Sequence, residues 1–401
     1  MTTETIQRGS LHIDPAVDAI FARLPEPDYP VNYQPEYPDP EALYAAIRDL
    51  RDVMPVTNPD QIINLRQRLG TLVQREACDP LITLDYCAEP ITLDVSAGER
   101  AAGSVATNDM LQTVVGAQTL FVPRNRGQYA KPRSAQFQVL PNGKTVVTYM
   151  GDSINSITDT AEARQPDPRR LVAGAQQAAE FEAALTAELG HHLPASHEAL
   201  SLAYEEAFAY THEGKEYGLS GDLLWVGERT RQLDGAHMAF ASRIENPIGV
   251  KLGPNTTSEY LEGLQHKLNP ANEAGRLVLM VRVGNDIEAL DRIARGIKAH
   301  NENAVIIYDC HGSTETLEDG GKHRSVEKTV GDIEALYRSL AQKCLRLHGV
   351  NIEMAPVDNL HQCTDRRNQR PTEAPVVDPL FSRLQIANIL MQIRHLLPSA
   401  V

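Results

Sequence analysis

Short apolar segments alternate with amphipathic helical ones from about residue 60 onward. The apolar segments have the length of buried strands, and most of them end in polar or charged residues. In chain order they are PLITLDYCAEP, TLFVPRNRG, SHEALSL, LLWVGERT, PIGVKLGP, RLVLMVRVG, NAVIIYDCHG and GVNIEMAP, of which SHEALSL has the shortest apolar run. Strand–helix alternation is typical of parallel sheets, and eight units favour an α/β fold of the closed (β/α)8 TIM-barrel type over an open sheet.

Apolar positions recur at three- and four-residue spacing between these segments, which predicts helices. The clearest helical patterns cover residues 258–267, 287–299, 325–347 and 383–397. Residues 1–60 are rich in Pro, Asp and Tyr, with two helical stretches at 16–24 and 40–53. We therefore expect a partly helical N-terminal extension over residues 1–60, packed on the body or on a second subunit, and a barrel over residues 61–401.

The polar residues of the apolar segments lie mostly at the carboxyl ends of the runs. In a (β/α)8 barrel those ends form the rim on which the active site is built. The order of the segments alone therefore predicts that eight residues converge on one mouth: Cys87, Arg124, Glu198, Glu228, Lys251, Arg282, His311 and Glu353. No GxGxxG or GxxxxGK[ST] loop is present, so a nucleotide cradle has no support.

Composition narrows the class of partner. The chain has 401 residues, 42% of them apolar, which is enough for a large core. Its 38 Lys and Arg against 53 Asp and Glu give a formal net charge of −15, so we expect neither nucleic acid nor a membrane as partner. No apolar run approaches the roughly 18 residues of a membrane helix, and no secretory signal is visible. The five scattered cysteines, without a CxxC pair, indicate reduced thiols and a cytoplasmic location.

Basic residues gather in the same segments despite the acidic total. Cations at strand ends lose hydration, and an anion is expected to offset that cost. Guanidinium groups suit phosphate and carboxylate oxygens. The set comprises Arg124, Arg126, Lys131, Arg133, Arg229, Arg231, Lys251, Arg282, Lys322 and Arg324. For Lys251 and Arg282 we favour a functional role, whereas for Arg126, Arg229 and Arg231 pairing with nearby carboxylates is an equal alternative.

Four metal-ligand types come from separate rim positions: Cys87, His311, Glu353 and Asp378. A thiolate, an imidazole and two carboxylates suit Mn, Fe, Co or Zn better than Mg or Ca. The alternative is that each is a hydrogen-bonded core residue, because the four do not form a short motif.

Several longer motifs resemble those of class II 3-deoxy-D-arabino-heptulosonate 7-phosphate (DAHP) synthases. They are RNRGQYAKPRS, GDSIN, SHEAL, WVGERTRQLDGAH, NPIGVKLGP, LNPANEAGRL and KHR, in the family's order over roughly residues 80 to 390. The resemblance implies a (β/α)8 barrel with an N-terminal extension. It also implies an enzyme of the shikimate pathway, or of a secondary-metabolite branch of it, that joins phosphoenolpyruvate to D-erythrose 4-phosphate.

Matched position by position, the resemblance implies roles for individual residues. It puts Cys87, His311, Glu353 and Asp378 on a divalent metal, commonly Mn or Co, with Zn or Fe as alternatives. It puts Arg124, Lys251 and Arg282, with the backbone of Glu228 and Arg229, on phosphoenolpyruvate. Arg133, Ser134, Lys322 and Arg324 resemble the cradle for erythrose 4-phosphate, and Trp225 lines the pocket. Lys131, Glu198 and Lys251 match the catalytic positions.

Three motifs depart from the family's pattern. YDCHGST replaces CDPMHGNT and places Cys310 next to His311; GVNIE has Asn351 where His is usual; and VDPLFS replaces CDPRLN around Asp378. The stretch between GDSIN and SHEAL has no room for the helical insertion that carries aromatic feedback in some relatives. We therefore expect a short form with weak or no inhibition by Phe, Tyr or Trp.

Three functions stay open at this point. The first is DAHP synthesis. The second is condensation of phosphoenolpyruvate with another aldehyde, such as an amino sugar phosphate. The third is a catalytically silent scaffold barrel, against which the unpaired cations argue. The resemblance also implies a homo-oligomer, a dimer being the simplest.

Overall fold

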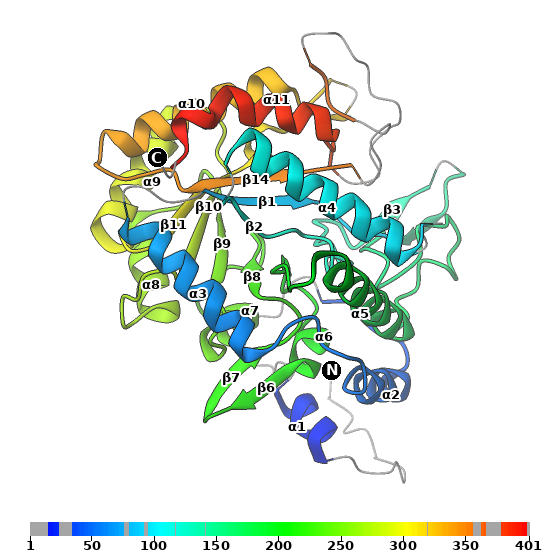
Figure 1. Cartoon of the computed structure of the whole chain (residues 1–401). Helices are drawn as coiled ribbons and strands as arrows, with labels where there is room; N and C mark the ends of the chain where they lie inside the picture. The colour runs from blue at the N-terminus through cyan, green and yellow to red at the C-terminus, as the bar shows by residue number, and fades with distance from the viewer. Residues whose placement is uncertain are drawn as a thin grey trace.

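Eight parallel strands form the centre of the protein (Figure 1). The computed structural model describes residues 15–23, 34–75, 80–91, 95–116, 118–140, 142–318, 320–355, 362–365 and 378–398. The central strands are β1 (Leu81–Asp85), β2 (Leu120–Phe121), β5 (Ser196–Glu198), β8 (Leu223–Val226), β9 (Ile248–Leu252), β10 (Leu277–Val281), β11 (Val305–Asp309) and β14 (Gly349–Glu353). Each lies in one of the eight apolar segments, so all eight predicted strands are confirmed, SHEALSL included.

The sheet closes on itself into a barrel. Its strand order is β2-β1-β14-β11-β10-β9-β8-β5, and every neighbouring pair is parallel. The two end strands meet because the backbone N–H of Ser196 in β5 donates a hydrogen bond of 2.9 Å to the carbonyl oxygen of Pro123, just after β2. The same stretch still pairs with β1, since Val122 N donates to Ile82 O at 3.0 Å. The chain therefore has the predicted (β/α)8 fold.

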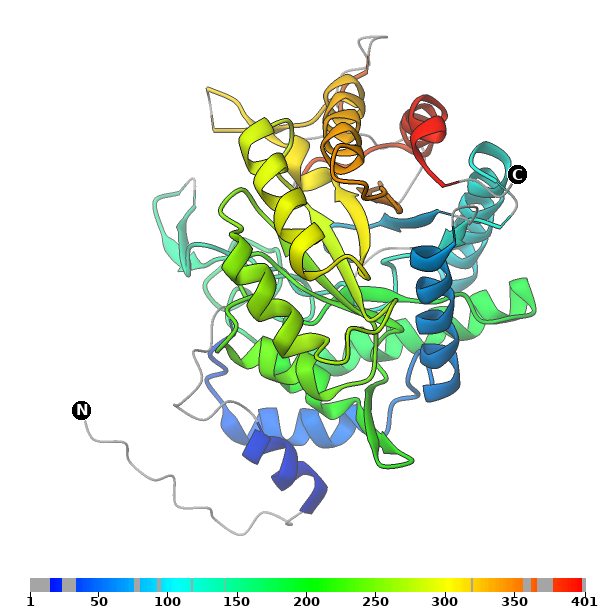
Figure 2. The same ribbon diagram turned by 90° about the vertical axis from the view of Figure 1, so that its left-hand side faces the viewer.

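A helix follows each barrel strand before the next begins. These helices are α4 (Ala97–Val114), α5 (Arg169–Leu189), α6 (Leu202–Ala207), α7 (Ala236–Arg243), α8 (Ser258–Leu268), α9 (Ile287–His300), α10 (Val326–Ala341) and α11 (Arg383–Ile393), the last continued by the 3-10 turn η2 (Arg394–Leu396). Figure 2 shows α8, α9 and α10 side by side on the outside of the strands.

Amphipathic spacing explains why these helices lie on the barrel. In α9 the buried residues Leu290, Ile293 and Ile297 recur at three- and four-residue spacing, and the Asp286 side chain caps the helix by accepting from Ala289 N at 3.0 Å. The predicted helices over 258–267, 287–299 and 383–397 are confirmed. The prediction over 325–347 was too long, because the chain turns after Ala341 and Cys344 takes a left-handed conformation with φ of 55°.

The N-terminal extension is helical where it is described. It contains α1 (Pro15–Arg23) and α2 (Pro40–Leu50), close to the two predicted ranges. Val17, Ile47 and Leu50 are fully buried in one apolar cluster with side chains of α5 and α6, and Figure 1 shows both helices beside them. Burial of this kind attaches the extension to the barrel. The division of the chain at residue 60 remains a prediction.

Helix α3 (Pro59–Gln74) closes the amino-terminal end of the barrel, which the sequence patterns did not predict. Leu65, Leu69 and Leu72 are buried in one cluster with the inward-facing residues Leu81, Leu120, Leu223, Val278 and Val305. The helix begins at a capping box in which Asn58 and Gln61 bond each other's backbone N–H. The barrel interior is therefore closed at this end and open at the other.

Trp225 fills the middle of the barrel. It is the single tryptophan of the chain and is 1% exposed. Gly249 on the neighbouring strand leaves room for it: a Cβ on Gly249 would lie 2.7 Å from Trp225 Cβ and 3.2 Å from Met280 Sδ. The indole therefore takes the space of a side chain on β9 and forms a floor beneath the open end.

Three short hairpins extend from the barrel. They are β3 (Phe137–Val139) with β4 (Thr145–Val147), β6 (Ala209–His212) with β7 (Lys215–Gly218), and β12 (Glu315–Thr316) with β13 (Lys322–His323). The first and third follow strand ends at the open side of the barrel, whereas the second precedes β8. Within the part of the chain that the structure describes, none of the helices is both long and apolar enough to cross a membrane.

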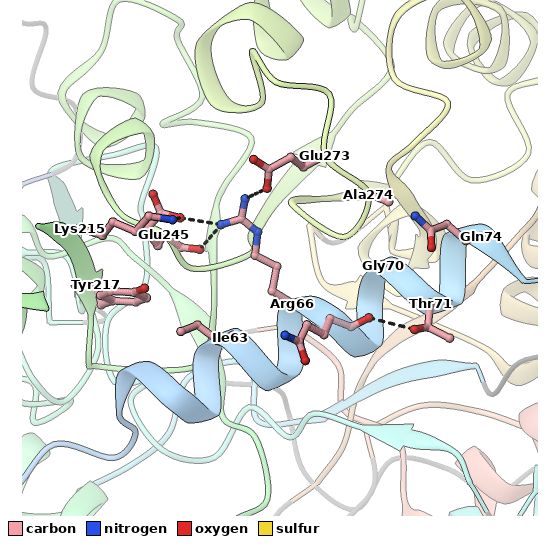
Figure 3. A pocket seen from close by; sticks show the side chains of 11 residues that line it. Ile63, Arg66, Gly70, Thr71, Gln74, Lys215, Tyr217, Glu245, Glu273 and Ala274 are labelled. Atoms are coloured by element: carbon pink, nitrogen blue, oxygen red, sulfur yellow. Dashed lines mark hydrogen bonds and ion pairs between the residues drawn. The ribbon is translucent and has the colours of Figure 1, made fainter. Parts of the chain in front are cut away.

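A cavity of about 460 Å³ lies at the closed end, between α3, β7 and the loops before β9 and β10 (Figure 3). Arg66 reaches across it: Nη1 lies 2.8 Å from Glu245 Oε2 and 3.0 Å from the Glu245 carbonyl oxygen, and Nη2 contacts Glu273. Among the described residues that line it, no buried side-chain polar atom lacks a hydrogen-bond partner. We interpret this cavity as part of the contact by which ion pairs of Arg66 hold α3 against the barrel.

Candidate active site at the barrel mouth

A second cavity, of about 440 Å³, opens at the carboxyl ends of the strands. Its lining residues are Cys87, Arg124, Gln128, Lys131, Pro132, Arg133, Ser134, Glu198, Gly227, Glu228, Arg229, Lys251, Arg282, His311, Thr314, Lys322, Glu353 and Asp378. All eight residues that strand order placed on one rim are among them. The wall is dominated by charged groups of both signs, which suits a polar, multiply charged ligand.

Four possible metal ligands meet on one side of this cavity. The ligand atoms of Cys87, His311, Glu353 and Asp378 all lie within 4.8 Å of one another. His311 Nε2 is 3.0 Å from Glu353 Oε1 and 3.5 Å from Asp378 Oδ2. Asp378 Oδ2 is in turn 3.5 Å from Cys87 Sγ. A transition metal binds such ligands at about 2.0–2.3 Å, so donors around one ion lie within about 4.6 Å of each other. The spacing and the mixed donor set both fit one divalent ion of the Mn, Fe, Co or Zn type.

The chain brings these four side chains together from distant segments. Cys87 lies two residues after β1 and Glu353 ends β14, and these strands are neighbours in the sheet. His311 lies in the 3-10 turn η1 (Cys310–Ser313) after β11, on the other side of β14. Asp378 precedes α11. The shortened YDCHGST motif therefore still places His311 beside Glu353.

The His311 ring is oriented by Asp309, the last residue of β11. His311 Nδ1 lies 2.7 Å from Asp309 Oδ1, and the His311 backbone N–H donates to the same oxygen at 3.1 Å. Burial alone would lower the pKa of His311, but the Asp309 and Glu353 carboxylates outweigh it and raise that pKa well above its usual value. With Nδ1 directed at Asp309, Nε2 faces the other three ligands, as a metal-binding imidazole requires.

Lys131 lies among the metal-ligand side chains. Its ammonium is 2.7 Å from Asp378 Oδ2 and also contacts the Cys87 sulfur. Burial alone would lower the pKa of Lys131, but Cys87, Asp378 and Glu353 outweigh that effect and raise it above its usual value. Lys131 is therefore a cation at the point where the metal group meets the rest of the cavity.

A second set of cations stands above the tryptophan floor. The Arg124 guanidinium carbon lies 5.0 Å and the Lys251 Nζ 5.7 Å from the centre of the Trp225 ring, a cation–π arrangement. Arg124 is 1% and Lys251 4% exposed. Lys251 Nζ is 3.3 Å from Asp309 Oδ2, and Arg124 Nη2 is 3.5 Å from Glu353 Oε1. These cations share their carboxylates with the metal group and keep positive charge facing the cavity.

Asn351, where the family motif has His, lies behind the wall between these two sets. Its Nδ2 donates to Asp309 Oδ1 at 3.1 Å, and its Oδ1 accepts from Thr83 Oγ1 at 2.6 Å and from Arg124 Nη1 at 3.4 Å. An amide can donate on one side and accept on the other, which this position requires. The substitution therefore keeps a hydrogen-bonded link between Asp309 and Arg124.

Two glutamates occupy the wall opposite the metal group. Glu198 Oε1 is buried without a hydrogen-bond partner, and a side chain on Gly227 would clash with it. The Glu228 carboxylate instead accepts from Gly253 N at 2.7 Å and from Arg231 Nη2 at 2.8 Å. Glu198 therefore offers a carboxylate to a ligand, whereas the Glu228 carboxylate is already hydrogen-bonded to the protein.

The outer part of the cavity is lined by Arg133, Ser134, Arg229 and Lys322. Arg229 Nε donates to Ser134 Oγ at 3.0 Å, and Arg133 Nε donates to the Tyr149 carbonyl oxygen at 2.7 Å. Lys322 is 45% exposed and pairs with Asp378. These side chains come from the loops after β2, β8 and β11, and their remaining donors suit a phosphate group.

The structure shows which of the three undecided basic residues, Arg126, Arg229 and Arg231, line the cavity and which pair with carboxylates. Arg126 is fully buried and pairs with Glu182, away from the mouth, and Arg231 pairs with Glu228 over the Tyr260 ring. Arg229 lines the cavity. Arg324 is 0% exposed and is not among the lining residues; the predicted pocket residue Trp225 is not among them either, since it is buried beneath Arg124 and Lys251. The position of Arg324 differs from the predicted cradle because its guanidinium lies behind the wall, against Glu353.

Four lining residues did not figure in the sequence analysis: Gln128, Pro132, Gly227 and Thr314. Asp309, which orients His311, was missed as well. Gln128 and Pro132 lie inside the RNRGQYAKPRS motif and Gly227 inside WVGERTRQLDGAH, so their neighbours were a usable signal. Asp309 was missed because a buried carboxylate at the end of an apolar run gives no indication of its partner.

Comparisons with known proteins identify the family and support the fold. The model of the class-II DAHP synthetase family matches residues 26–191 and 187–374. A phospho-2-dehydro-3-deoxyheptonate aldolase of Streptomyces coelicolor is 32% identical, over 84% of this chain and 87% of that protein. The enzyme of that name (AroG) from Mycolicibacterium smegmatis is also 32% identical, over 83% and 84%. Among solved structures, the phospho-2-dehydro-3-deoxyheptonate aldolase of Francisella tularensis has a TM-score of 0.55 at 14% identity, covering 89% of this chain and 97% of that one, which supports the fold.

Proposed function

The chain belongs to the class-II DAHP synthetase family, and from this premise we propose how its barrel mouth condenses phosphoenolpyruvate with D-erythrose 4-phosphate to give DAHP and phosphate. One observation carries the proposal: a single cavity joins a four-donor metal group to two separate sets of cations. Two phosphate esters that repel each other in water can be held together there, and positioning of this kind supplies much of a bimolecular rate enhancement.

We assign the inner cations to phosphoenolpyruvate. Arg124 and Lys251 line the cavity beside the buried Trp225 ring, where charge is strongly felt, and Arg282 lines the same cavity. We assign the backbone of Glu228 and Arg229, which also line the cavity, to the same ligand. A small ligand that carries both a carboxylate and a phosphate matches three cations in a narrow space.

We assign the outer cations to the phosphate of the aldehyde. Arg133, Ser134 and Lys322 line the same cavity, and Ser134 and Lys322 are exposed whereas Arg124 and Lys251 of the inner set are buried. An aldehyde held there by its phosphate directs its carbonyl group inward, between the metal group and the inner cations.

Cys87, His311, Glu353 and Asp378 would hold the divalent ion, with Mn or Co expected and Zn or Fe as alternatives. When bound there, such an ion supplies Lewis acidity toward the aldehyde carbonyl oxygen. Asp309 supports this group by holding His311 in the orientation that turns Nε2 to the cavity.

The remaining steps use the protein's own groups. Carbon 3 of phosphoenolpyruvate forms a bond to the aldehyde carbon, and Lys131 donates a proton to the aldehyde oxygen. Carbon 2 is left electron-poor and takes up water, whose proton goes to Glu198, the carboxylate with a buried, unpartnered oxygen. The bond between carbon 2 and the bridging oxygen then breaks, phosphate leaves with the proton of the carbon 2 hydroxyl, and a ketone remains at carbon 2. Lys251 and Arg124 offset the charge of the departing phosphate.

The three altered motifs do not favour a different aldehyde. Cys310 and Asn351 lie behind the wall, and Leu380 is buried beside Cys87 and Ala355; none of these three lines the cavity. A scaffold is disfavoured too, because the buried cations Arg124 and Lys251 pair only with carboxylates of Glu353 and Asp309 that the metal group also uses, which is a costly arrangement to keep without a ligand.

The aldehyde is tested by turnover of the purified enzyme with phosphoenolpyruvate and either erythrose 4-phosphate or an amino sugar phosphate, with the products identified by mass spectrometry. We expect DAHP from the first and no condensation with the second. Phosphoenolpyruvate labelled with ¹⁸O at the bridging oxygen should pass the label to phosphate. Condensation with the amino sugar phosphate alone would assign the chain to the other reaction, and label retained in the sugar product would contradict the proposed bond cleavage.

Four further properties belong to the proposal. We propose a cytoplasmic location, supported by the scattered free thiols. We propose a homo-oligomer, such as a dimer, formed through the N-terminal extension. We propose weak or no feedback by aromatic amino acids, supported by the short connection between GDSIN and SHEAL. We also propose that the enzyme serves the shikimate pathway or a secondary-metabolite branch of it.

A further inference from the structure

The Arg324 guanidinium has a partner within the protein for each of its donors. A guanidinium has five N–H groups. Here Nε donates to Thr314 Oγ1 at 3.2 Å and Nη2 donates to the same oxygen at 2.7 Å. Nη1 donates to the Pro379 carbonyl oxygen at 2.7 Å, and both Nη atoms lie 3.3 Å from Glu353 Oε2. These five contacts account for the five donors and leave none for a phosphate.

The burial of Arg324 agrees with that count. The residue is 0% exposed, and its guanidinium carbon lies 5.8 Å from the centre of the Phe381 ring. Lys322, two residues earlier on β13, lines the cavity and is 45% exposed. Arg324 follows β13 and, although it lies only two residues after Lys322, it is buried behind the wall against Glu353.

The partners of Arg324 belong to three separate segments of the metal site. Thr314 follows η1, which carries His311; Glu353 ends β14; and Pro379 is the neighbour of Asp378. Glu353 presents Oε1 to His311 and Oε2 to Arg324, so the guanidinium determines which carboxylate oxygen faces the cavity. The bond to the Pro379 carbonyl oxygen fixes the backbone next to Asp378, where the family motif is altered.

From this geometry we infer that Arg324 is a positioning residue of the metal site and not a ligand of the aldehyde phosphate. It fixes Glu353 and the Asp378 segment relative to His311, so that three of the four donors keep their spacing whether or not substrate is present. The inference rests on the proposed metal-dependent function and deepens it. Partners of metal ligands typically change metal affinity by about 10–100-fold when they are removed.

The experiment measures Co²⁺ affinity directly and the steady-state constants separately. Co²⁺ binding to the chelator-treated full chain is followed by the visible absorption of the ion, for the unchanged protein and for Arg324→Met, Arg324→Lys and Arg133→Met. We expect Arg324→Met to weaken Co²⁺ binding at least 10-fold while the KM for erythrose 4-phosphate, at saturating Co²⁺, stays within about twofold. Arg133→Met should do the reverse, raising that KM and leaving Co²⁺ affinity unchanged.

Two further variants guard against a general folding defect. Thr314→Val removes one partner of Arg324 without removing the charge, and it should weaken Co²⁺ binding in the same direction by a smaller factor. Arg338→Met, at an exposed position of α10, should change nothing. Arg324→Lys keeps the charge but not the fork, so it should restore only part of the lost affinity.

The outcomes separate this inference from the function on which it rests. The inference alone would be overturned if Arg324→Met left Co²⁺ affinity unchanged. It would also be overturned if Arg324→Met greatly raised the KM for erythrose 4-phosphate at saturating Co²⁺, because Arg324 would then bind the aldehyde phosphate. A chain that binds no Co²⁺ before any substitution would overturn the metal site itself.

Discussion

His311 is held by a carboxylate only two residues before it in the chain: its Nδ1 lies 2.7 Å from Oδ1 of Asp309. The same carboxylate is 3.3 Å, through Oδ2, from the ammonium of Lys251. Asp309 therefore touches one residue of the metal group and one of the inner cations, and it fixes their relative positions.

Replacement of Asp309 by Asn should impair the metal group. An amide replaces one carboxylate oxygen with an NH2 donor, whereas Asp309 now accepts from His311 and Asn351 and pairs with Lys251, so the His311 ring loses its fixed tautomer. We expect kcat/KM to fall and Co²⁺ binding to weaken, each by about 10–100-fold. Asp291→Asn, on the surface of α9, is the matched control and should leave both unchanged. Equal Co²⁺ affinity in the two variants would show that Asp309 does not orient His311.

The Lys251 ammonium should dominate the affinity for phosphoenolpyruvate. Trp225 is the only tryptophan and lies 5.7 Å from Lys251 Nζ, so its fluorescence reports on ligand binding next to it. Lys251→Met leaves a buried phosphate or carboxylate without its cation, and we expect the Kd to rise by at least about 100-fold, or roughly 3 kcal/mol. Lys215→Met, at the closed end of the barrel, should bind normally. A fluorescence titration that is the same for both variants would remove Lys251 from the site.

Much of the fold and of the cavity could be predicted from the order of the strands. Eight polar residues at strand ends were expected on one rim, and all eight line one cavity, because parallel strands in a barrel must end on the same side. Arg324 was placed in the substrate cradle because the KHR motif resembles the family's. Its side chain is instead buried against Thr314, Glu353 and Pro379, and a sequence pattern does not encode contacts between segments so far apart in the chain. Helix α3 was missed because its apolar face meets the closed end of the barrel, a contact that exists only after the barrel forms.

Gly249 should be intolerant of a side chain. A methyl group there would meet Trp225 Cβ at 2.7 Å and Met280 Sδ at 3.2 Å, in the packed interior below the site. We expect Gly249→Ala to lower the free energy of unfolding by about 1–3 kcal/mol through overpacking. Gly331→Ala, in α10 with no atom within 4 Å of the new methyl group, should instead raise it by about 0.4–1 kcal/mol. Chemical denaturation measures both, and a Gly249→Ala protein as stable as the unchanged one would contradict this packing.

His192 should make stability depend on pH on the alkaline side. Burial lowers its pKa, but hydrogen bonds to Asp222 at 3.0 Å and Glu182 at 2.9 Å outweigh burial and raise the pKa from 6.5 to about 9. Because the pKa of the folded state exceeds that of the unfolded state, the stabilisation is complete below pH 6.5 and is lost as the pH rises toward 9. The difference corresponds to at most about 3 kcal/mol.

The matched variant for this prediction is His192→Gln, which keeps a polar side chain but does not titrate. Arg126, which pairs with Glu182, is charged throughout this range and does not supply the pH dependence. Unfolding free energies measured between pH 6 and 9 should fall with pH more steeply in the unchanged protein than in His192→Gln. Parallel curves for the two proteins would assign the pH dependence to another group.

The central claim, a metal-dependent condensation of two phosphate esters in one cavity, is tested most directly by phosphate release from phosphoenolpyruvate after chelation of metal. The account predicts that release requires both erythrose 4-phosphate and an added divalent ion such as Mn²⁺ or Co²⁺, and that Cys87→Ser or Asp378→Asn strongly reduces the recovery at a given ion concentration. Full activity of the chelated protein, with no ion detected by elemental analysis, would contradict it.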